Sequence, residues 1–315
     1  MKKIYITGLA GFIGFHLAAH LKKKGDFVIG LDNFNAYYDS ELKHRRVQLL
    51  QDLGISCIKG DICDNQLMEK MVVEHGITHV VHLAAQAGVR YSLKHPEAYV
   101  HSNLEGFVSV MELCRRHPSV KCIYASSSSV YGLNRKQPFS ENDPTDSPAN
   151  LYGATKKANE LIAHSYHHLY GISVTGLRFF TVYGPWGRPD MAYFSFTKNI
   201  HDGKPISVYN AGEMHRDFTY IDDVVLGIIA AIDKGYPCEI FNLGNNSPED
   251  VRELIRLIEK ALGREALQHN LPMQAGDVHS TFADIEKSRE MLGFSPKTSL
   301  QQGIAKFVEW YLLEF

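Results

Sequence analysis

The sequence predicts an α/β protein with a Rossmann-type, doubly wound parallel sheet and a second, smaller α/β domain. Three observations support this prediction. Short apolar runs typical of buried strands alternate with helical segments from residue 3 onwards. A glycine triplet joins the first of these strands to the first helix. After Phe180 the alternation ends and glycine and proline become frequent, which predicts that another domain begins there.

The expected strands and helices follow one another in strict alternation. Strands are expected at residues 3–8, 26–32, 55–61, 78–85, 120–127 and 173–180. Helices are expected between them, at residues 12–24, 41–53, 65–74, 96–116 and 151–170. Strands that each connect to the next through a helix form a parallel sheet covered by helices on both faces.

The later part of the chain returns once to the same pattern. A helix at residues 224–233 and the strand after it resemble elements of the first sheet. We therefore expect two domains that interleave in sequence. Residues 1–178 with about 222–245 would form the larger, nucleotide-binding domain, and about 179–221 with 246–315 the smaller, substrate-binding domain.

The composition is that of an ordinary globular protein. The 315 residues are 44% hydrophobic and 22% charged, which is enough to bury a full core. The formal net charge is -2 and the chain has no long run of one charge, which argues against a nucleic acid or a membrane surface as partner. Chemistry on a small molecule is the remaining expectation.

Two further features favour a cytoplasmic protein. The N-terminal "MKKIYITGLAGFIG" begins like a signal peptide, but glycines and His16 interrupt its apolar run. No window reaches the roughly 18 apolar residues of a membrane helix. The cysteines form no C-x-x-C pair and mostly fall in apolar elements, so we expect reduced thiols.

Gly8, Gly11 and Gly14 lie in "TGLAGFIG", between the first expected strand and the first expected helix. Glycines there permit a tight turn, close approach of the backbone to a pyrophosphate and close packing of the helix. The helix N-terminus then faces the anion. A glycine triplet alone is weak evidence for a dinucleotide site, because glycines also end strands for structural reasons.

Asp32 strengthens the dinucleotide prediction. It closes the second expected strand, 18 residues after Gly14, near the separation of about 20 typical of an acid that binds the adenosine ribose. A carboxylate there accepts hydrogen bonds from ribose hydroxyls and repels a 2′-phosphate, so NAD is predicted over NADP. Asp61 is expected at the adenine edge, although a strand-end turn explains it nearly as well. The other cofactor contacts predicted around these motifs are Phe12, Ile13, Asn33 and Ile62.

Tyr152 and Lys156 of "YGATK" are four residues apart on an expected helix and therefore share one face. The pKa of a phenol is about 10, and a neighbouring cation favours the phenolate. We expect Lys156, together with the positive charge of nicotinamide, to make Tyr152 a base near neutral pH. On most helices a tyrosine and a lysine at this spacing form a surface pair. The spacing is evidence for a catalytic pair only when it follows a dinucleotide-binding turn in the chain.

Five motifs together resemble the extended short-chain dehydrogenase/reductase family, over essentially the whole chain. They occur in the family's order: "TGLAGFIG", "HLAAQAG", "ASSSSVYG", "YGATK" and "RDFTYIDD". The resemblance implies that Tyr152 is the catalytic base, that Lys156 binds the nicotinamide ribose and that Ser127 shares the proton of the substrate's O4. It also implies cofactor contacts at the end of the fourth strand, from Leu83, Ala84 and Ala85.

Four serines in "YASSSSVYG" directly follow an expected strand, where a flexible linker is not expected. Sugar-nucleotide 4,6-dehydratases carry Asp and Glu at the two positions after the catalytic hydroxyl, and UDP-glucuronate decarboxylases typically carry Glu at the second. This chain has Ser128 and Ser129 there, which favours an epimerase. Neutral hydroxyls can donate to a substrate carboxylate without repelling it. Ser126 is expected to be a turn residue with a locally satisfied hydroxyl.

Three segments resemble UDP-glucuronate 4-epimerases more closely than UDP-galactose 4-epimerases: "LDNFNAYYD", "AAQAGVRYS" and "RFFTVYGPWGRPDMA". The resemblance implies that Thr181 and Arg188 lie near the sugar carboxylate and that Arg90 lies beside the substrate cleft. Without it, Arg188 would be read as a solvated charge in a glycine- and proline-rich loop. Trp186 departs from the family, in which many members have a basic or small residue, so the conformation of this loop is left open.

The nucleotide half of the substrate has its own predicted contacts. The resemblance implies that Arg216 binds the diphosphate, for which a guanidinium fork is well suited, and that Asp277 binds the uridine ribose. Arg216 could instead belong to an ion-pair network with Asp217. The histidines of "HSYHH" have helical spacing but no accompanying ligand motif, and we expect no metal.

The predicted activity is the reversible inversion of C4 between UDP-glucuronate and UDP-galacturonate, with NAD as cofactor and a 4-keto intermediate. Such a β-keto acid readily loses carbon dioxide, so the enzyme must hold the carboxylate away from the cleavage geometry. The candidates for this grip are the serines, Thr181 and Arg188. The alternatives are an epimerase of UDP-glucose or N-acetylhexosamines, a UDP-glucuronate decarboxylase, and a non-catalytic NAD(H)-binding regulator. By analogy with the family, a homodimer through helix 151–170 is expected.

Overall fold

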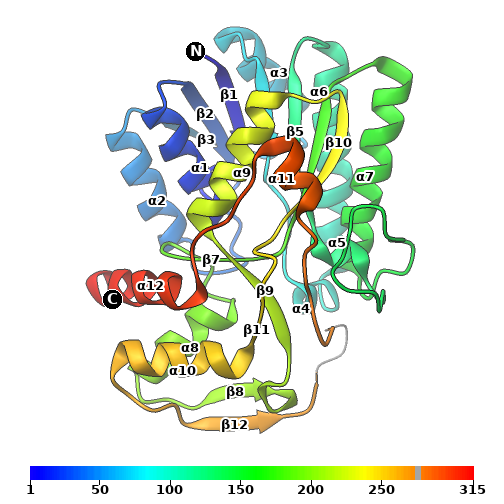
Figure 1. Ribbon diagram of the computed structural model, residues 1–315. Helices are drawn as coiled ribbons and strands as arrows, with labels where there is room; N and C mark the ends of the chain where they lie inside the picture. The colour runs from blue at the N-terminus through cyan, green and yellow to red at the C-terminus, as the bar shows by residue number, and fades with distance from the viewer. Residues whose placement is uncertain (274–277) are drawn as a thin grey trace.

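The computed structural model describes residues 1–273 and 278–315. Its larger part is a seven-stranded parallel sheet covered by helices on both faces (Figure 1). The strands follow the order β10-β6-β5-β4-β1-β2-β3, so the chain reverses direction across the sheet between β1 and β4. These strands are β1 (Lys3–Thr7), β2 (Phe27–Asp32), β3 (Ser56–Lys59), β4 (His79–His82), β5 (Lys121–Ser127), β6 (Val174–Phe179) and β10 (Cys238–Leu243). The predicted Rossmann-type sheet is confirmed.

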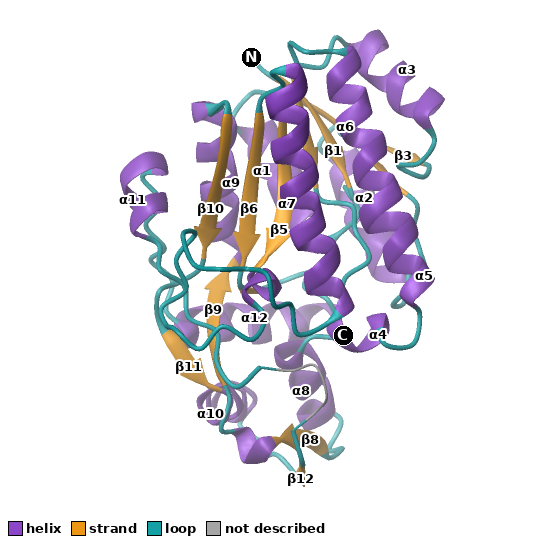
Figure 2. Cartoon of the chain, turned by 90° about the vertical axis from the view of Figure 1, so that its right-hand side faces the viewer, coloured by secondary structure: helices purple, strands orange, loops and turns teal. Residues whose placement is uncertain are grey.

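Most strands are buried along their length because helices exclude water from both sides of the sheet, whereas the edge strand β3 has exposed ends at Ser56 and Lys59. One face carries α1 (Phe12–Lys23), α2 (Glu41–Asp52) and α9 (Ile221–Lys234). The other carries α3 (Asn65–His75), α6 (Gly106–Arg116) and α7 (Leu151–Tyr170). Two hydrophobic clusters fill the spaces between these helices and the sheet. Both faces can be followed in the turned view of Figure 2.

One predicted helix differs in the structure. The helix expected at 96–116 is divided into α5 (Pro96–Tyr99), a π-helix η1 (Val100–Glu105) and α6. Within η1 the buried Asn103 accepts from Gln86 N at 2.8 Å and donates to Thr155 Oγ1 at 3.0 Å. These bonds tie the segment after β4 to α7, which accounts for the irregular turn at this point.

A smaller assembly lies beyond the carboxyl ends of the strands, in the lower part of Figure 1. It contains a three-stranded sheet in the order β11-β9-β7 and a two-stranded sheet of β12 and β8. These strands are β7 (Thr181–Tyr183), β8 (Ile206–Tyr209), β9 (His215–Tyr220), β11 (Pro248–Asp250) and β12 (Gln268–Leu271). The remaining helices are α4 (Val89–Ser92), η2 (Ser128–Tyr131), α8 (Ala192–His201), η3 (Asn210–Gly212), α10 (Val251–Leu262), α11 (Glu286–Leu292) and α12 (Leu300–Glu314).

The chain passes between the two assemblies more than once, since α9 and β10 return to the large sheet after β9. This arrangement supports the proposed interleaved division of the chain. Among the described residues, no helix combines the length and apolar character required to span a bilayer.

Candidate active site

Two hollows meet where the strands of the large sheet end. The predicted cofactor contacts that line the first are Gly8, Gly11, Phe12, Ile13, Gly14, Asp32, Asn33, Ile62, Leu83, Ala84, Ala85, Tyr152 and Lys156. The predicted substrate contacts that line the second are Arg90, Ser128, Ser129, Thr181, Arg188 and Arg216. Ser127, Tyr152 and Arg188 line both. Ser127 and Tyr152 therefore lie at the junction of the two hollows, and Lys156 lies in the first.

The glycine-rich turn connects β1 to α1, and its glycines have separate roles. Gly8 has a φ of 75°, in the left-handed region, and its N–H donates to Leu31 O at 2.7 Å. A Cβ on Gly14 would lie 2.3 Å from the carbonyl oxygen of Gly8, so only glycine permits this packing of α1. Gly11 is the N-cap of α1 and lines the first hollow. The start of the helix is therefore available to bind an anion.

Asp32 ends β2 and is buried beside this turn. Its carboxylate accepts from Phe34 N at 2.8 Å. The Nζ atom of Lys43, on α2, lies 3.8 Å from Asp32 Oδ1 and donates to Asn35 O at 3.1 Å. Both charged side chains line the first hollow, so an acid and a base lie together at the position predicted for the ribose.

Asp61 and Ile62 follow β3 at the edge predicted for the adenine. Ile62 lines the first hollow, and the Asp61 carboxylate accepts from Asn33 Nδ2 at 3.1 Å. Burial acts to raise the pKa of Asp61, but hydrogen bonds from Cys63 and Asn33 outweigh it and lower the pKa. Asp61 is therefore an ionised acceptor at this edge.

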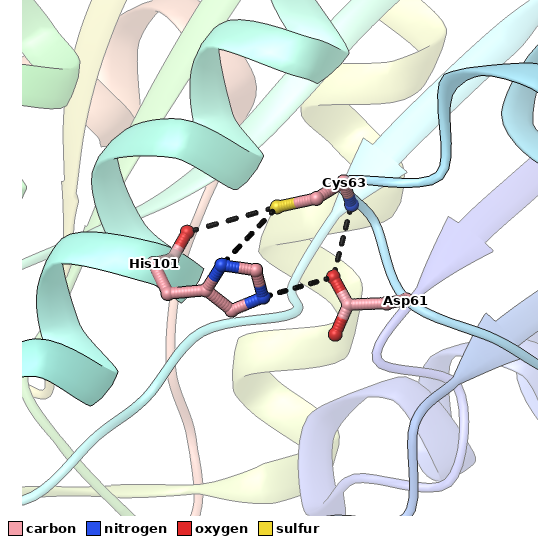
Figure 3. A group of neighbouring side chains, drawn as sticks. All are labelled: Asp61, Cys63 and His101. Carbon is pink, nitrogen blue, oxygen red and sulfur yellow. Dashed lines mark hydrogen bonds and ion pairs between the residues drawn. The ribbon is translucent and has the colours of Figure 1, made fainter.

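The same carboxylate belongs to a polar cluster with Cys63 and His101 (Figure 3). Asp61 Oδ1 accepts from Cys63 N at 2.9 Å and lies 3.4 Å from His101 Nε2. The other ring nitrogen, Nδ1, lies 3.8 Å from Cys63 Sγ and 2.8 Å from Glu105 Oε2. The two ring nitrogens thus face different partners, so His101 bridges the two acids. The cluster fastens η1 to the end of β3.

Tyr152 and Lys156 lie one turn apart on α7, as predicted. Lys156 is only 2% exposed, and its Nζ donates to Ala125 O at 2.9 Å. Tyr152 forms a hydrogen bond with Ser127, at the end of β5. The helix and the strand end thereby bring a phenol, a hydroxyl and an ammonium group to one place.

The charges of these groups differ from the expectation in one respect. Burial raises the pKa of Tyr152 above its usual value, against the opposing effects of the Ser127 hydrogen bond and the Arg188 charge. Burial also lowers the pKa of Lys156 to about 8. The Lys156 ammonium is directed to the Ala125 carbonyl, and the protein groups that act to acidify Tyr152 are Ser127 and Arg188. The protein alone therefore keeps Tyr152 protonated at neutral pH.

The four serines separate into two groups. Ser126 is buried within β5 and donates to Glu160 Oε1 at 2.7 Å, so its hydroxyl is satisfied within the protein, but by a distant residue and not locally in a turn as expected. Ser127 donates to Ser129 Oγ at 3.2 Å, and Ser128 and Ser129 begin η2. The last two line the second hollow, so the turn is an ordered part of the site.

Arg188 lies on the loop between β7 and α8. Its Nε lies 3.1 Å from Asp190 Oδ1, and its Nη2 lies 2.6 Å from Asp190 Oδ2. Tyr37, from the loop after β2, donates to Asp190 Oδ2 at 2.9 Å. The Arg188 guanidinium also lies over the Tyr37 ring, 5.7 Å from its centroid. A loop of the larger part thus holds the arginine at the junction of the hollows.

Thr181 and Arg90 line the second hollow from opposite elements, β7 and α4. The Arg90 guanidinium lies over the ring of Tyr209, 4.8 Å from its centroid. Tyr209 lines the same hollow. The predicted ribose contact, Asp277, lies outside the described residues.

Arg216, predicted to bind the diphosphate, also lines the second hollow. Its Nη1 donates to His215 O at 2.9 Å and to His279 O at 3.2 Å. The neighbouring Asp217 is fully buried, where it accepts backbone N–H groups, including that of Ala283 at 3.0 Å. Asp217 thus joins β9 to the segment after residue 278, and Arg216 contributes to the hollow.

This arrangement identifies a family. Residues 4–244 match the NAD dependent epimerase/dehydratase family. The chain belongs to this family. It is 54% identical over 327 aligned residues to UDP-glucuronate 4-epimerase 4 of Arabidopsis thaliana, with 98% of this chain and 75% of the relative covered. It is 51% identical to UDP-glucuronate 4-epimerase 1 of the same plant, with 98% and 76% covered.

Solved structures of family members have the same fold. A UDP-glucuronic acid 4-epimerase from Bacillus cereus, in complex with UDP-glucuronic acid and NAD, matches with a TM-score of 0.93 and 35% identity, covering 99% of this chain and 100% of that one. A UDP-glucose 4-epimerase from Thermotoga maritima, with UDP-glucose, matches with a TM-score of 0.90 and 30% identity, covering 99% of both chains.

The residues that were not predicted from the sequence include Tyr37, Lys43 and Asp190, which line the hollows, and the buried Arg46. The motifs that predict the site lie at the ends of strands, whereas "ELKHRR" lies within an expected helix. Its many charged residues are typical of a solvent-exposed helix face. The structure instead directs Lys43 and Arg46 inward, where both are buried. Asp190 follows Arg188 by two residues in "GRPD", and this spacing of opposite charges was the available signal.

Proposed function

We propose that this chain is an NAD-dependent 4-epimerase that interconverts UDP-glucuronate and UDP-galacturonate. The observation that carries the proposal is the position of Arg188 and two neutral serines around the same junction as Tyr152. A carboxylate-bearing sugar fits this set, because a guanidinium and hydroxyls can all donate to it. The plant relatives and the Bacillus cereus structure support the same substrate.

The reaction begins at the O4 hydroxyl of the sugar. NAD, when bound, would supply a hydride acceptor for C4 and a positive nicotinamide ring; the 4-keto sugar must then turn its opposite face to the cofactor, so that return of the hydride inverts C4. Tyr152 takes the O4 proton, and Ser127 shares it through the hydrogen bond between their hydroxyls. Lys156 holds the nicotinamide ribose, with Asp32 at the adenosine ribose. Since the protein alone keeps the phenol protonated, the base forms only when the cofactor is present.

The 4-keto intermediate is a β-keto acid, and its carboxylate must be restrained. Arg188, Ser128, Ser129 and Thr181 are proposed to hold it in an orientation that disfavours cleavage of the C–C bond. The absence of Asp and Glu at the two serine positions fits this task, because an acid there would repel the carboxylate.

The nucleotide half is proposed to bind across β9, with Arg216 on the diphosphate, Arg90 beside the cleft and Asp277 on the uridine ribose. The five free cysteines are consistent with the cytoplasmic location that we propose. A homodimer through α6 and α7 is proposed as well. Exposed apolar side chains on these two helices support it, namely those of Val108, Leu161 and Leu169.

The test is incubation of the purified protein with UDP-glucuronate, UDP-glucose or UDP-N-acetylglucosamine in separate reactions without added cofactor. We expect UDP-galacturonate from the first and little product from the others. The matched control is Tyr152→Phe, which removes one hydroxyl and should abolish turnover while bound NAD is retained. Equal turnover of UDP-glucose, or UDP-pentose as the main product, would refute the proposal in favour of the corresponding alternative.

A further inference from the structure

We propose that Arg46 and His16 are positioning residues that lock the loop carrying Arg188 to the cofactor-binding turn. Both belong to helices of the larger part, α2 and α1. The inference rests on the proposed function, because it assigns Arg188 to the sugar carboxylate. It adds that the dinucleotide turn and the carboxylate-binding arginine are held as one rigid unit.

Three successive carbonyl groups just before Arg188 are held by these two side chains. Pro185 O lies 2.9 Å from His16 Nε2. Trp186 O accepts from Arg46 Nε at 3.1 Å and from Nη2 at 2.6 Å, and Gly187 O accepts from Nη2 at 3.0 Å. A loop would normally leave such carbonyls to water, so this set defines the path of the backbone into Arg188.

The other side of the Arg46 guanidinium reaches the dinucleotide turn. Its Nη1 donates to Ala10 O at 2.9 Å and to the Tyr38 hydroxyl at 2.9 Å. Ala10 lies between Gly8 and Gly11 of the turn. All five N–H groups of Arg46 are therefore used, and one planar group joins the cofactor turn to the substrate loop.

Arg46 is completely buried, and its five hydrogen bonds go to uncharged oxygen atoms. Burying a charge on neutral acceptors is costly compared with an apolar side chain of similar size. Lysine has three donors on one nitrogen and cannot reproduce the fork. The arrangement therefore indicates that the backbone of residues 185–188 must be held in a defined conformation.

Backbone conformation and side-chain packing also constrain the loop. Trp186 has a φ of 59°, in the left-handed region that a bulky residue rarely adopts. Its ring is held between Phe15, at 5.7 Å between centroids, and Trp310, at 5.2 Å. A Cβ on Gly187 would lie 1.8 Å from the Tyr193 hydroxyl oxygen. Burial lowers the pKa of His16 to about 4, so the neutral ring donates to Pro185 O through Nε2–H.

The decisive experiment is a double-mutant cycle of Arg46→Lys with Arg188→Ala, in the NAD-bound protein. Affinity for UDP-glucuronate and for UDP is measured with KM and kcat. If Arg46 acts through Arg188, Arg46→Lys should weaken UDP-glucuronate binding by about tenfold, as for loss of a charge-assisted hydrogen bond. UDP binding should stay within about twofold, and the effect should vanish in the Arg188→Ala background.

A second pair of variants covers the possibility that Arg46→Lys does not fold. His16→Leu removes the bond to Pro185 O and should weaken UDP-glucuronate selectively, whereas His16→Gln retains a donor and should restore most of the affinity. The matched control is Arg45→Gln. Arg45 touches the Trp186 ring, at 5.2 Å from its centroid, but none of the three carbonyls, so its loss should leave substrate selectivity unchanged.

Equal weakening of UDP and UDP-glucuronate, or an effect of Arg46→Lys that persists without Arg188, would overturn the inference and leave a structural role only. Failure of the proposed function is seen separately, in the wild type. If the wild-type protein does not prefer UDP-glucuronate to UDP-glucose, the substrate assignment fails whatever the variants do.

Discussion

Arg188 and Asp190 form a two-point ion pair at the junction of the cofactor and substrate hollows, with nitrogen–oxygen distances of 3.1 and 2.6 Å. The arginine proposed to bind the sugar carboxylate thus already has an anionic partner. Tyr37 donates to the same carboxylate at 2.9 Å and keeps it in place. A substrate carboxylate would therefore share one guanidinium with Asp190, and the balance of these charges can be tested.

Arg188→Ala should weaken UDP-glucuronate binding by at least about 1.5–3 kcal/mol, the value of a charge-assisted hydrogen bond. The loss should exceed that of the double variant Arg188→Ala/Asp190→Ala, because the single change leaves Asp190 unpaired beside the substrate carboxylate. Calorimetric titration of UDP-glucuronate and UDP measures both. UDP binding serves as the control and should barely change. Equal losses in the two variants would show that Asp190 does not act on the substrate.

Replacement of Ser128 and Ser129 by alanine should slow epimerisation and release UDP-pentose and carbon dioxide. The reason is that the β-keto acid then has fewer hydroxyl contacts to hold its carboxylate away from the cleavage geometry. Chromatography of the products gives the ratio of pentose to epimer. Ser126→Ala is the matched control, because the Ser126 hydroxyl donates to the buried Glu160 and Ser126 does not line the second hollow. A serine variant that is slow but never forms pentose rejects the restraint role.

Asp32→Ala should weaken NAD binding and allow NADP to bind. Removal of the carboxylate ends its repulsion of a 2′-phosphate, and Lys43 Nζ, 3.8 Å from Asp32 Oδ1, then offers a positive charge to that phosphate. Fluorescence titration with both dinucleotides measures the preference. The double variant Asp32→Ala/Lys43→Met should lose the gain for NADP. An unchanged NAD/NADP ratio in the single variant would place Asp32 away from the ribose.

Lys156→Met should inactivate the enzyme and stabilise the nucleotide-free protein. Burial lowers the pKa of Lys156 from 10.5 to about 8, so the charged form costs the folded state about 3 kcal/mol at neutral pH. Below pH 8 the full cost is present. As pH rises from 8 to 10.5 the unfolded state binds more protons, so wild-type stability should rise toward that of the variant.

Urea unfolding at pH 7 and pH 10 measures this difference. Lys157→Arg is the control, because Lys157 is the next residue on α7, its side chain is 22% exposed and arginine keeps the positive charge that lies 3.7 Å from Glu160. Its stability difference from the wild type should hardly depend on pH. A Lys156→Met protein no more stable than the wild type at pH 7 would mean that the buried ammonium is well compensated.

Much of the cofactor site could be predicted from the sequence because its signals are local. Gly8 requires a left-handed conformation, and Gly14 requires the absence of a side chain. Both requirements arise within one turn of the backbone, so the glycines occur at fixed separations that can be recognised in the sequence. Tyr152 and Lys156 share a helix face for the same local reason.

The identity of the amino acids by itself determined the alternating α/β fold, the dinucleotide turn and the pair on α7, since each depends on periodicity and backbone freedom. Only the tertiary structure decided that Arg46 enters the core, that Tyr37 donates to the Asp190 partner of Arg188 and that burial raises the pKa of Tyr152. These outcomes depend on desolvation and on partners far apart in the chain. No residue spacing in the sequence predicts them, because a charged side chain such as that of Arg46 is solvated or buried according to the residues that pack around it.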